Sequence, residues 1–178
     1  MQSLVLGLTL FRIFASPVIF IAAIFFSNYW LSFWFFNLAA LTDYFDGSLA
    51  RKYRVESKLG AILDPIGDKL LVLFSIITII LITQNSYIAL MGGLILSREF
   101  WVSALREYSS AQHNSQATRV TFIAKTKTTF QFISLGMFFL GEAADLALIS
   151  FIASFFLLIA LFLGYKSLVD YTQRVFEN

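Results

Sequence analysis

The sequence of 178 residues has no cysteine, only two prolines, a single histidine and few charged residues. Without cysteine, the chain has no disulfide, no thiolate metal site and no cysteine nucleophile. Charged residues make up 13% of the chain, whereas soluble domains average about a quarter. So few charges leave too little polar surface for a water-soluble domain, and that class of protein is excluded.

Apolar residues account for 58% of the chain, and its mean hydropathy is +0.78. A transmembrane helix needs about 20 mainly apolar residues. Apolar runs predict such spans near residues 10–27, 31–49, 59–83, 87–107, 119–140 and 145–168. We therefore expect an all-α integral membrane protein with six transmembrane helices. Residues 1–178 would form a single membrane-embedded domain, with membrane lipid and no nucleic acid among its partners.

Basic residues are absent from three of the expected connections, near residues 27–30, 83–87 and 141–145. The thirteen basic residues are Arg12, Arg51, Lys52, Arg54, Lys58, Lys69, Arg98, Arg106, Arg119, Lys125, Lys127, Lys166 and Arg174. Cytoplasmic loops carry the excess of Lys and Arg in membrane proteins. The distribution predicts a multi-pass protein of the inner (cytoplasmic) cell membrane. Both termini and a polar active-site cavity would open to the cytoplasm.

Four aspartates lie close together in this apolar chain. Asp43 and Asp46 are three residues apart, and Asp64 and Asp68 are four apart, so each pair lies on one face of its own helix. A charge at membrane depth is costly unless it is paired, hydrated or bound to a metal, which marks the cluster as a functional site. Carboxylates without nearby His or Cys suit Mg²⁺ or Mn²⁺. Two such ions about 4 Å apart can clamp the oxygens of a phosphoryl displacement.

The residues between these aspartates complete the pattern D-x2-D-G-x2-A-R-x8-G-x3-D-x3-D. This pattern resembles the signature of the CDP-alcohol phosphotransferases, membrane enzymes that join a CDP-activated group to an alcohol and release CMP. The resemblance implies the following site residues: metal ligands Asp43, Asp46, Asp64 and Asp68, with Asp68 also the general base, and a nucleotide pocket of Gly47, Ala50, Arg51 and Gly60. Without the pattern, the small residues would be read as helix-packing positions and Arg51 as an interface anchor.

A second polar cluster offers a site for the phosphate of an acceptor alcohol. Arg98 and Arg106 are eight residues apart and share a helix face, and Lys125 and Thr126 add donors at the start of the next span. The alternative is structural, because Glu99 and the glutamate after Arg106 are placed to neutralise these arginines.

The strings S-R-E, S-A-L-R-E and K-x-K-T-T-x-Q in this region, together with residues 8–12, resemble bacterial phosphatidylglycerophosphate synthases within that superfamily. The resemblance implies attack of glycerol 3-phosphate on the β-phosphorus of CDP-diacylglycerol, giving phosphatidylglycerol phosphate and CMP, in a homodimeric enzyme. One departure is Leu6, where the family usually has asparagine. This leaves open any nucleotide contact from that side.

Several alternatives remain at this stage. The acceptor could be inositol phosphate, serine or a second phosphatidylglycerol. A secondary transporter would also hold intramembrane acids, but no internal repeat is visible here and the acids gather in one hairpin. An intact aspartate set argues against an inactive scaffold. His113, the single histidine, lies in a polar stretch and is predicted to be a solvated loop residue, so direct displacement is favoured over a covalent intermediate.

Overall fold

The computed structural model describes the backbone of residues 2–53, 58–112 and 121–176, and within these ranges the side chains of residues 2–5, 43–53, 58 and 61 are left out. His113 lies outside the described residues. The described elements are all helices: α1 (Gln2–Phe25), α2 (Tyr29–Tyr53), α3 (Lys58–Thr83), α4 (Ser86–Ala111), α5 (Phe122–Ala143) and α6 (Ala147–Phe176). The six predicted segments are therefore confirmed as helices.

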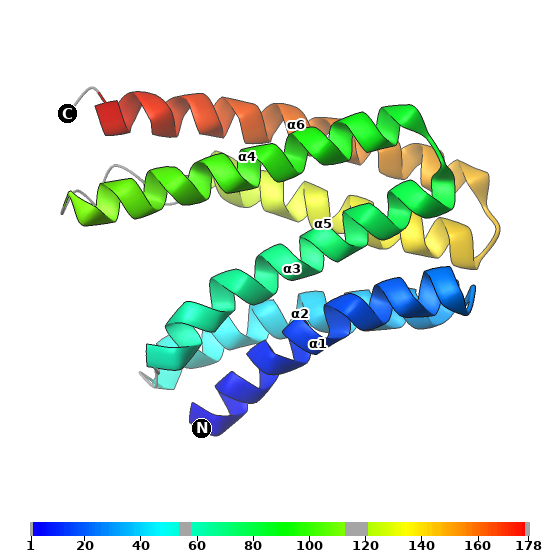
Figure 1. Cartoon of the computed structure of the whole chain (residues 1–178), viewed down its shortest axis with the longest axis horizontal. Helices are drawn as coiled ribbons and strands as arrows, with labels where there is room; N and C mark the ends of the chain where they lie inside the picture. The colour runs from blue at the N-terminus through cyan, green and yellow to red at the C-terminus, as the bar shows by residue number, and fades with distance from the viewer. Residues whose placement is uncertain (1, 54–57, 113–120, 177–178) are drawn as a thin grey trace.

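The helices form two groups that run along a common long axis (Figure 1). α1 packs against both α2 and α3, while α6 packs against α4 and α5. Contacts of α2 with α5 and of α3 with α4 join the groups. Ile19, Phe36, Leu71, Leu135 and Phe139 come from four helices and are at most 1% exposed. These side chains form the apolar centre that fixes the positions of the helices.

Three short turns gather at the end of the bundle opposite both termini (Figure 1). Each contains a non-glycine residue with left-handed backbone: Ser27 (φ 49°), Gln84 (φ 47°) and Asp145 (φ 53°). These are the three connections that lack Lys and Arg. The described starts of α1, α3 and α5 and the described ends of α2, α4 and α6 lie at the opposite end (Figure 1), which agrees with the predicted division of the chain between two ends.

The turns before α2 and α4 contain fewer residues than the sequence predicted, because an asparagine side chain caps the start of each helix. Asn28 Oδ1 accepts from the Leu31 amide at 3.0 Å, and Asn85 Oδ1 accepts from the Tyr87 amide at 2.9 Å. Such bonds satisfy amides that have no partner in the first turn of a helix. The aromatic residues predicted within these two connections therefore belong to α2 and α4.

The last helix extends well past the predicted end at residue 168. Tyr171 is fully buried against Val102, Leu105 and Ala124 of the neighbouring helices. Its hydroxyl accepts a hydrogen bond from the Thr121 amide at 3.3 Å. Burial of this aromatic side chain anchors the extra turns of α6, which the apolar run alone did not reveal.

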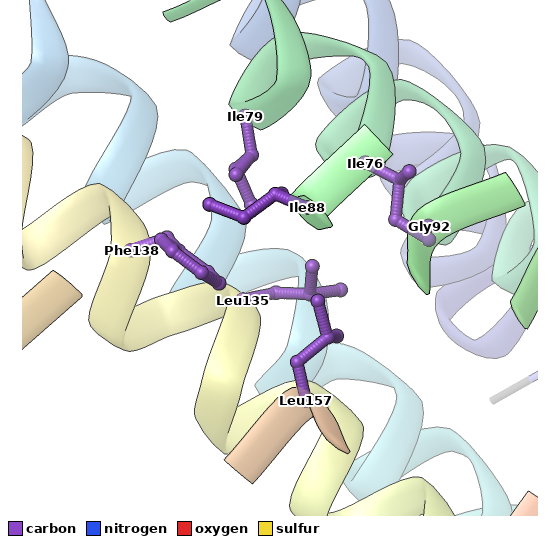
Figure 2. Close-up of a pocket in the computed structure, with 7 residues that line it drawn as sticks. All are labelled: Ile76, Ile79, Ile88, Gly92, Leu135, Phe138 and Leu157. Carbon is purple, nitrogen blue, oxygen red and sulfur yellow. The ribbon is translucent and has the colours of Figure 1, made fainter. Parts of the chain in front are cut away.

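Close packing near the turn end depends on Gly92. A Cβ at this position would lie 2.6 Å from Ile76 Cγ2 on α3, so only glycine lets α3 and α4 approach this closely. Figure 2 shows the small pocket beside this contact, lined by Ile76, Ile79, Ile88, Gly92, Leu135, Phe138 and Leu157. Its lining is apolar throughout and offers no group for chemistry.

By length and apolar composition, four of the described helices are candidates to cross a membrane: the segments Leu6–Phe25, Ile62–Thr83, Ser86–Ala111 and Ala147–Phe176. α5 is interrupted by Lys125, Lys127 and Gln131, and the described side chains of α2 end at residue 42. Large apolar side chains such as Phe14, Phe151 and Phe162 are more than half exposed. Such an exterior suits lipid and agrees with the expectation of an integral membrane protein.

Candidate active site

A cavity of about 1190 Å³ lies between α2, α3, α4 and α5. Charged residues line it from three helices: Asp64, Asp68 and Lys69 come from α3, Arg98, Glu99 and Arg106 from α4, and Lys125 and Lys127 from α5. Two of the four clustered aspartates thus line the same space as Arg98, Arg106 and Lys125 of the second polar cluster. Its volume is ample for a nucleotide headgroup together with a small acceptor.

The acidic wall is formed by Asp64 and Asp68, which are one helical turn apart on α3 and both line the cavity. The Asp68 side chain is 44% exposed. The shared face predicted for this pair is therefore present. Both carboxylates face a space that a substrate or a cation can enter.

Two side chains of α1 donate hydrogen bonds to these carboxylates. The Thr9 hydroxyl donates to Asp64 Oδ1, and Arg12 Nη1 donates to Asp68 Oδ1 in an ion pair. Thr9 and Arg12 are fully buried. Beside the ion pair α1 and α3 are in contact, since a Cβ at Gly67 would lie at ordinary van der Waals distances from Ile13 Cγ1 (3.5 Å) and Arg12 Cβ (3.7 Å). A charged pair at this depth also lowers the cost of placing either charge in the bundle.

Neither Thr9 nor Arg12 was predicted as a site residue. The sequence offered one usable signal, since an arginine inside an apolar span is costly without a partner. What it did not offer was the identity of that partner, which lies 56 positions away.

The other predicted aspartates and most of the predicted nucleotide pocket lie on α2. The backbone of Asp43, Asp46, Gly47, Ala50 and Arg51 is helical, but their side chains lie outside the described residues. Gly60 is buried near the start of α3. Within the described part of the chain, no group of three or more His, Cys, Asp or Glu side chains gathers to hold a metal. Convergence of all four aspartates stays a prediction.

The described acids suit a divalent cation by their chemistry. Asp64 and Asp68 offer hard carboxylate oxygens, and the cavity lining contains no His or Cys. Mg²⁺ and Mn²⁺ prefer such ligands and retain several waters, for which a cavity of this size has room. The donor set therefore fits the ions that the sequence predicted.

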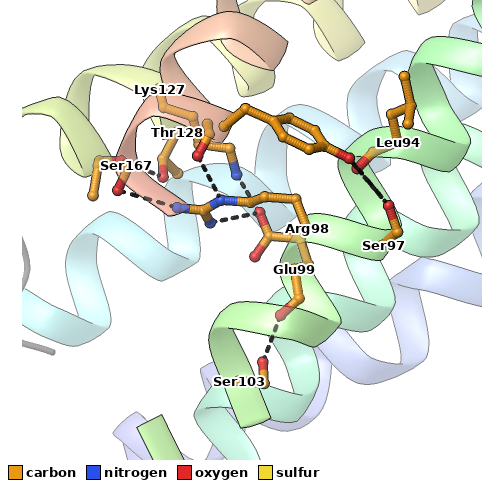
Figure 3. Close-up of polar contacts among 11 residues, drawn as sticks. Leu94, Ser97, Arg98, Glu99, Ser103, Lys127, Thr128 and Ser167 are labelled. Carbon is orange, nitrogen blue, oxygen red and sulfur yellow. Dashed lines mark hydrogen bonds and ion pairs between the residues drawn. The ribbon is translucent and has the colours of Figure 1, made fainter. Parts of the chain in front are cut away.

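The basic wall is organised around Glu99, as Figure 3 shows. Its carboxylate accepts from Lys127 Nζ and from Arg98 Nη1, the latter at 3.4 Å. Arg98 also donates from Nε to the Gly164 carbonyl at 3.1 Å and from Nη2 to the Ser167 hydroxyl at 3.3 Å. Arg98 and Lys127 are 6% and 3% exposed. All three guanidinium nitrogens of Arg98 thus have protein partners.

The remaining predicted acceptor residues differ in position. Arg106 and Lys125 are exposed, line the cavity and form no ion pair with a described residue. Thr126 is absent from the cavity lining, and its hydroxyl donates to the Phe122 carbonyl at 3.0 Å. The alternative that the glutamates neutralise the arginines therefore holds for Glu99 and Arg98, which form an ion pair. Arg106 and Lys125 keep their charge available to the cavity.

Lys127 was not among the predicted site residues, although its string was noted. It follows Lys125 by two positions, so the two lysines point in different directions from α5. Lys127 points inward and is buried with Glu99, whereas Lys125 stays at the exposed rim. Lys127 lies three residues after the buried Ala124 and four before the buried Gln131, so it shares their face of α5 and Lys125 does not. This spacing was the signal that distinguishes the two lysines.

Comparison with known proteins agrees with this arrangement. The family model for CDP-alcohol phosphatidyltransferase matches residues 5–165. The chain belongs to the CDP-alcohol phosphatidyltransferase family. The match covers all four aspartates, the α1 donors and the basic wall, so the whole cavity lies inside the family domain.

Several bacterial relatives named CDP-diacylglycerol–glycerol-3-phosphate 3-phosphatidyltransferase are similar to this chain. The protein of Cereibacter sphaeroides is 42% identical over 78% of this chain and 63% of its own length. That of Rickettsia bellii is 38% identical over 88% of this chain and 86% of its own. That of Escherichia coli is 34% identical over 72% of this chain and 71% of its own. The match therefore spans less than two thirds of the Cereibacter protein.

Proposed function

We propose that this protein transfers the phosphatidyl group of CDP-diacylglycerol to glycerol 3-phosphate, forming phosphatidylglycerol phosphate and releasing CMP. One observation carries the proposal: Asp64 and Asp68 line the same cavity as the exposed cations Arg106 and Lys125. The acids suit the metal-assisted phosphoryl chemistry of the family, and the cations suit the phosphate of the acceptor. The names of the bacterial relatives support this choice of acceptor.

In the proposed site, Asp43, Asp46, Asp64 and Asp68 would hold Mg²⁺ or Mn²⁺, with two ions as the expected number. When bound, the metal neutralises the phosphate charges of the donor and of departing CMP. Arg51 would pair with a donor phosphate, and the small side chains of Gly47, Ala50 and Gly60 would leave space for the nucleotide.

Asp68 is the proposed general base. The attacking hydroxyl of the acceptor must lose a proton as its oxygen bonds to phosphorus, and CMP leaves as a stable anion that needs no proton. Asp68 lines the cavity and 44% of its side chain is exposed, so the hydroxyl of an acceptor can reach its carboxylate. Arg12 would hold this carboxylate in place during the transfer.

For the acceptor phosphate we propose Arg106 and Lys125 as direct partners. Arg98 would attract the phosphate by its charge without a direct hydrogen bond, since its nitrogens are already bonded to protein groups. Thr126 would join only if its hydroxyl turns from the Phe122 carbonyl.

For membrane placement we propose that all six helices span the inner membrane and that the end bearing both termini faces the cytoplasm. The distribution of basic residues supports this orientation. It gives the water-soluble acceptor direct access to the cavity. A homodimer is the expected assembly, by resemblance to the family.

The decisive experiment measures CMP release by the purified full-length protein in lipid nanodiscs containing CDP-diacylglycerol. We expect release with glycerol 3-phosphate and Mg²⁺ or Mn²⁺, and loss of release in excess chelator that is reversed by added metal. Inositol phosphate and serine serve as comparison acceptors. Equal turnover with inositol phosphate would contradict the proposed acceptor, and full turnover in chelator would contradict the metal requirement.

Removing one rim cation should weaken acceptor binding selectively. We expect Arg106→Ala to raise the KM for glycerol 3-phosphate by about 10- to 100-fold, because a charge-assisted contact to phosphate contributes roughly 1.5–3 kcal/mol. The KM for CDP-diacylglycerol should stay unchanged. Lys166→Ala is a matched control, since it removes an exposed cation that does not line the cavity. An unaltered acceptor KM in Arg106→Ala would show that this arginine is not a phosphate contact.

A further inference from the structure

One buried polar group of the cavity wall has no role in the site described so far. Gln131 lines the cavity but is 1% exposed. Its side-chain oxygen, Oε1, has no hydrogen-bond partner among the described residues. Leaving such a group unsatisfied costs about 1–3 kcal/mol, so an unpartnered amide oxygen in a cavity wall indicates a ligand that donates to it. The Ser75 hydroxyl is also without a described partner, but it does not line the cavity.

The position of Gln131 along α5 relates it to the acceptor. Gln131 follows Lys127 by one helical turn and Lys125 by six residues, which is roughly 9 Å along the helix axis. A lysine side chain and a three-carbon acceptor together span that distance. With the acceptor phosphate at Lys125 and Arg106, the carbon chain would extend toward Gln131 and toward Asp68, which lines the same cavity from α3.

Glycerol 3-phosphate has two hydroxyl groups with different tasks. The terminal hydroxyl attacks phosphorus and must meet the base, whereas the secondary hydroxyl on C2 does not react. Within the proposed function, on which this inference rests, we infer that Gln131 Oε1 accepts a hydrogen bond from the secondary hydroxyl. Gln131 is then a specificity-determining residue that selects a phosphorylated diol over a simple phosphorylated alcohol.

The test removes the hydroxyl from the substrate and the amide from the protein in turn. The substrate pair is glycerol 3-phosphate and 3-hydroxypropyl phosphate, which keeps the attacking hydroxyl and lacks the secondary one. CMP release gives kcat/KM for each acceptor. Gln131→Met removes the amide oxygen at similar volume. Thr128→Val is the matched control, since Thr128 lines the same wall but its hydroxyl already donates to the Ala124 carbonyl.

We expect the wild-type protein to favour glycerol 3-phosphate by about 10- to 100-fold, the range that an unpaired buried acceptor implies. In Gln131→Met this preference should fall to within about threefold, through loss of activity on glycerol 3-phosphate alone. Thr128→Val should keep the wild-type preference. Because the analogue measures the same chemistry in the same variant, a general structural defect would lower both activities equally and leave their ratio unchanged.

Three results would overturn the role of Gln131: a wild-type protein that does not discriminate between the two acceptors, a preference that survives in Gln131→Met, or an effect confined to the KM for CDP-diacylglycerol. The first needs no variant, so the inference stays testable even if Gln131→Met does not fold. Failure of the proposed function is a separate result, seen as no CMP release from wild-type protein with glycerol 3-phosphate.

Discussion

Asp68→Asn is expected to lower kcat for CMP release by about 10²- to 10⁴-fold, the range that a positioned general base contributes. Asparagine keeps the shape of the side chain and an oxygen that can accept from Arg12, but it neither carries charge nor takes a proton. The loss should therefore appear in kcat, with the KM for CDP-diacylglycerol close to that of the wild type. Single-turnover CMP release in nanodiscs measures this directly.

Asp145→Asn provides the control for this substitution. Asp145 is exposed in the α5–α6 turn, at the end of the bundle away from the termini, and has a left-handed backbone that asparagine also adopts. It should keep wild-type activity. Wild-type turnover in Asp68→Asn would remove Asp68 from the base role and direct attention to Asp64.

Glu99→Gln should cause the largest loss of stability. The substitution keeps the size of the side chain but leaves Lys127 and Arg98 buried side by side without a counter-charge. Breaking one side of a buried ion pair costs about 3–5 kcal/mol. The free energy of unfolding, measured by reversible denaturation in mixed micelles, should fall by about 3 kcal/mol.

Glu107→Gln is the corresponding control on the same helix. Glu107 is exposed and forms no ion pair with a described residue. Its substitution should change the free energy of unfolding by less than about 0.5 kcal/mol. Equal stability of the two variants would mean that Glu99 does not compensate the buried cations.

The two ion-pair systems explain how so apolar a bundle holds a charged cavity. Arg12 faces Asp68 from α1, and Lys127 faces Glu99 from α5, so each wall of the cavity carries its own counter-charge. On the α4–α5 side, Arg98 and Lys127 have internal partners and support the wall, while Arg106 and Lys125 form no ion pair with a described residue and are left for ligand. This division separates residues that shape the cavity from those proposed to bind substrate.

Much of this protein was determined by the sequence alone. Long apolar runs decide where helices form, because in lipid a helix satisfies all its backbone hydrogen bonds within one segment of the chain. Fixed spacing places Asp64 and Asp68 on one face, because residues four apart on a helix are neighbours. The D-x2-D-G-x2-A-R-x8-G-x3-D-x3-D pattern led to the family to which the chain belongs.

The tertiary structure decided the relations between helices. Sequence spacing says nothing about which face of one helix meets another, because that register is set by side-chain packing across the core. The partners of Arg12 and Lys127 lie 56 and 28 positions away, so no local pattern identified them. The same packing turned Lys127 inward and left Lys125 at the rim, and it buried the amide of Gln131 in the cavity wall.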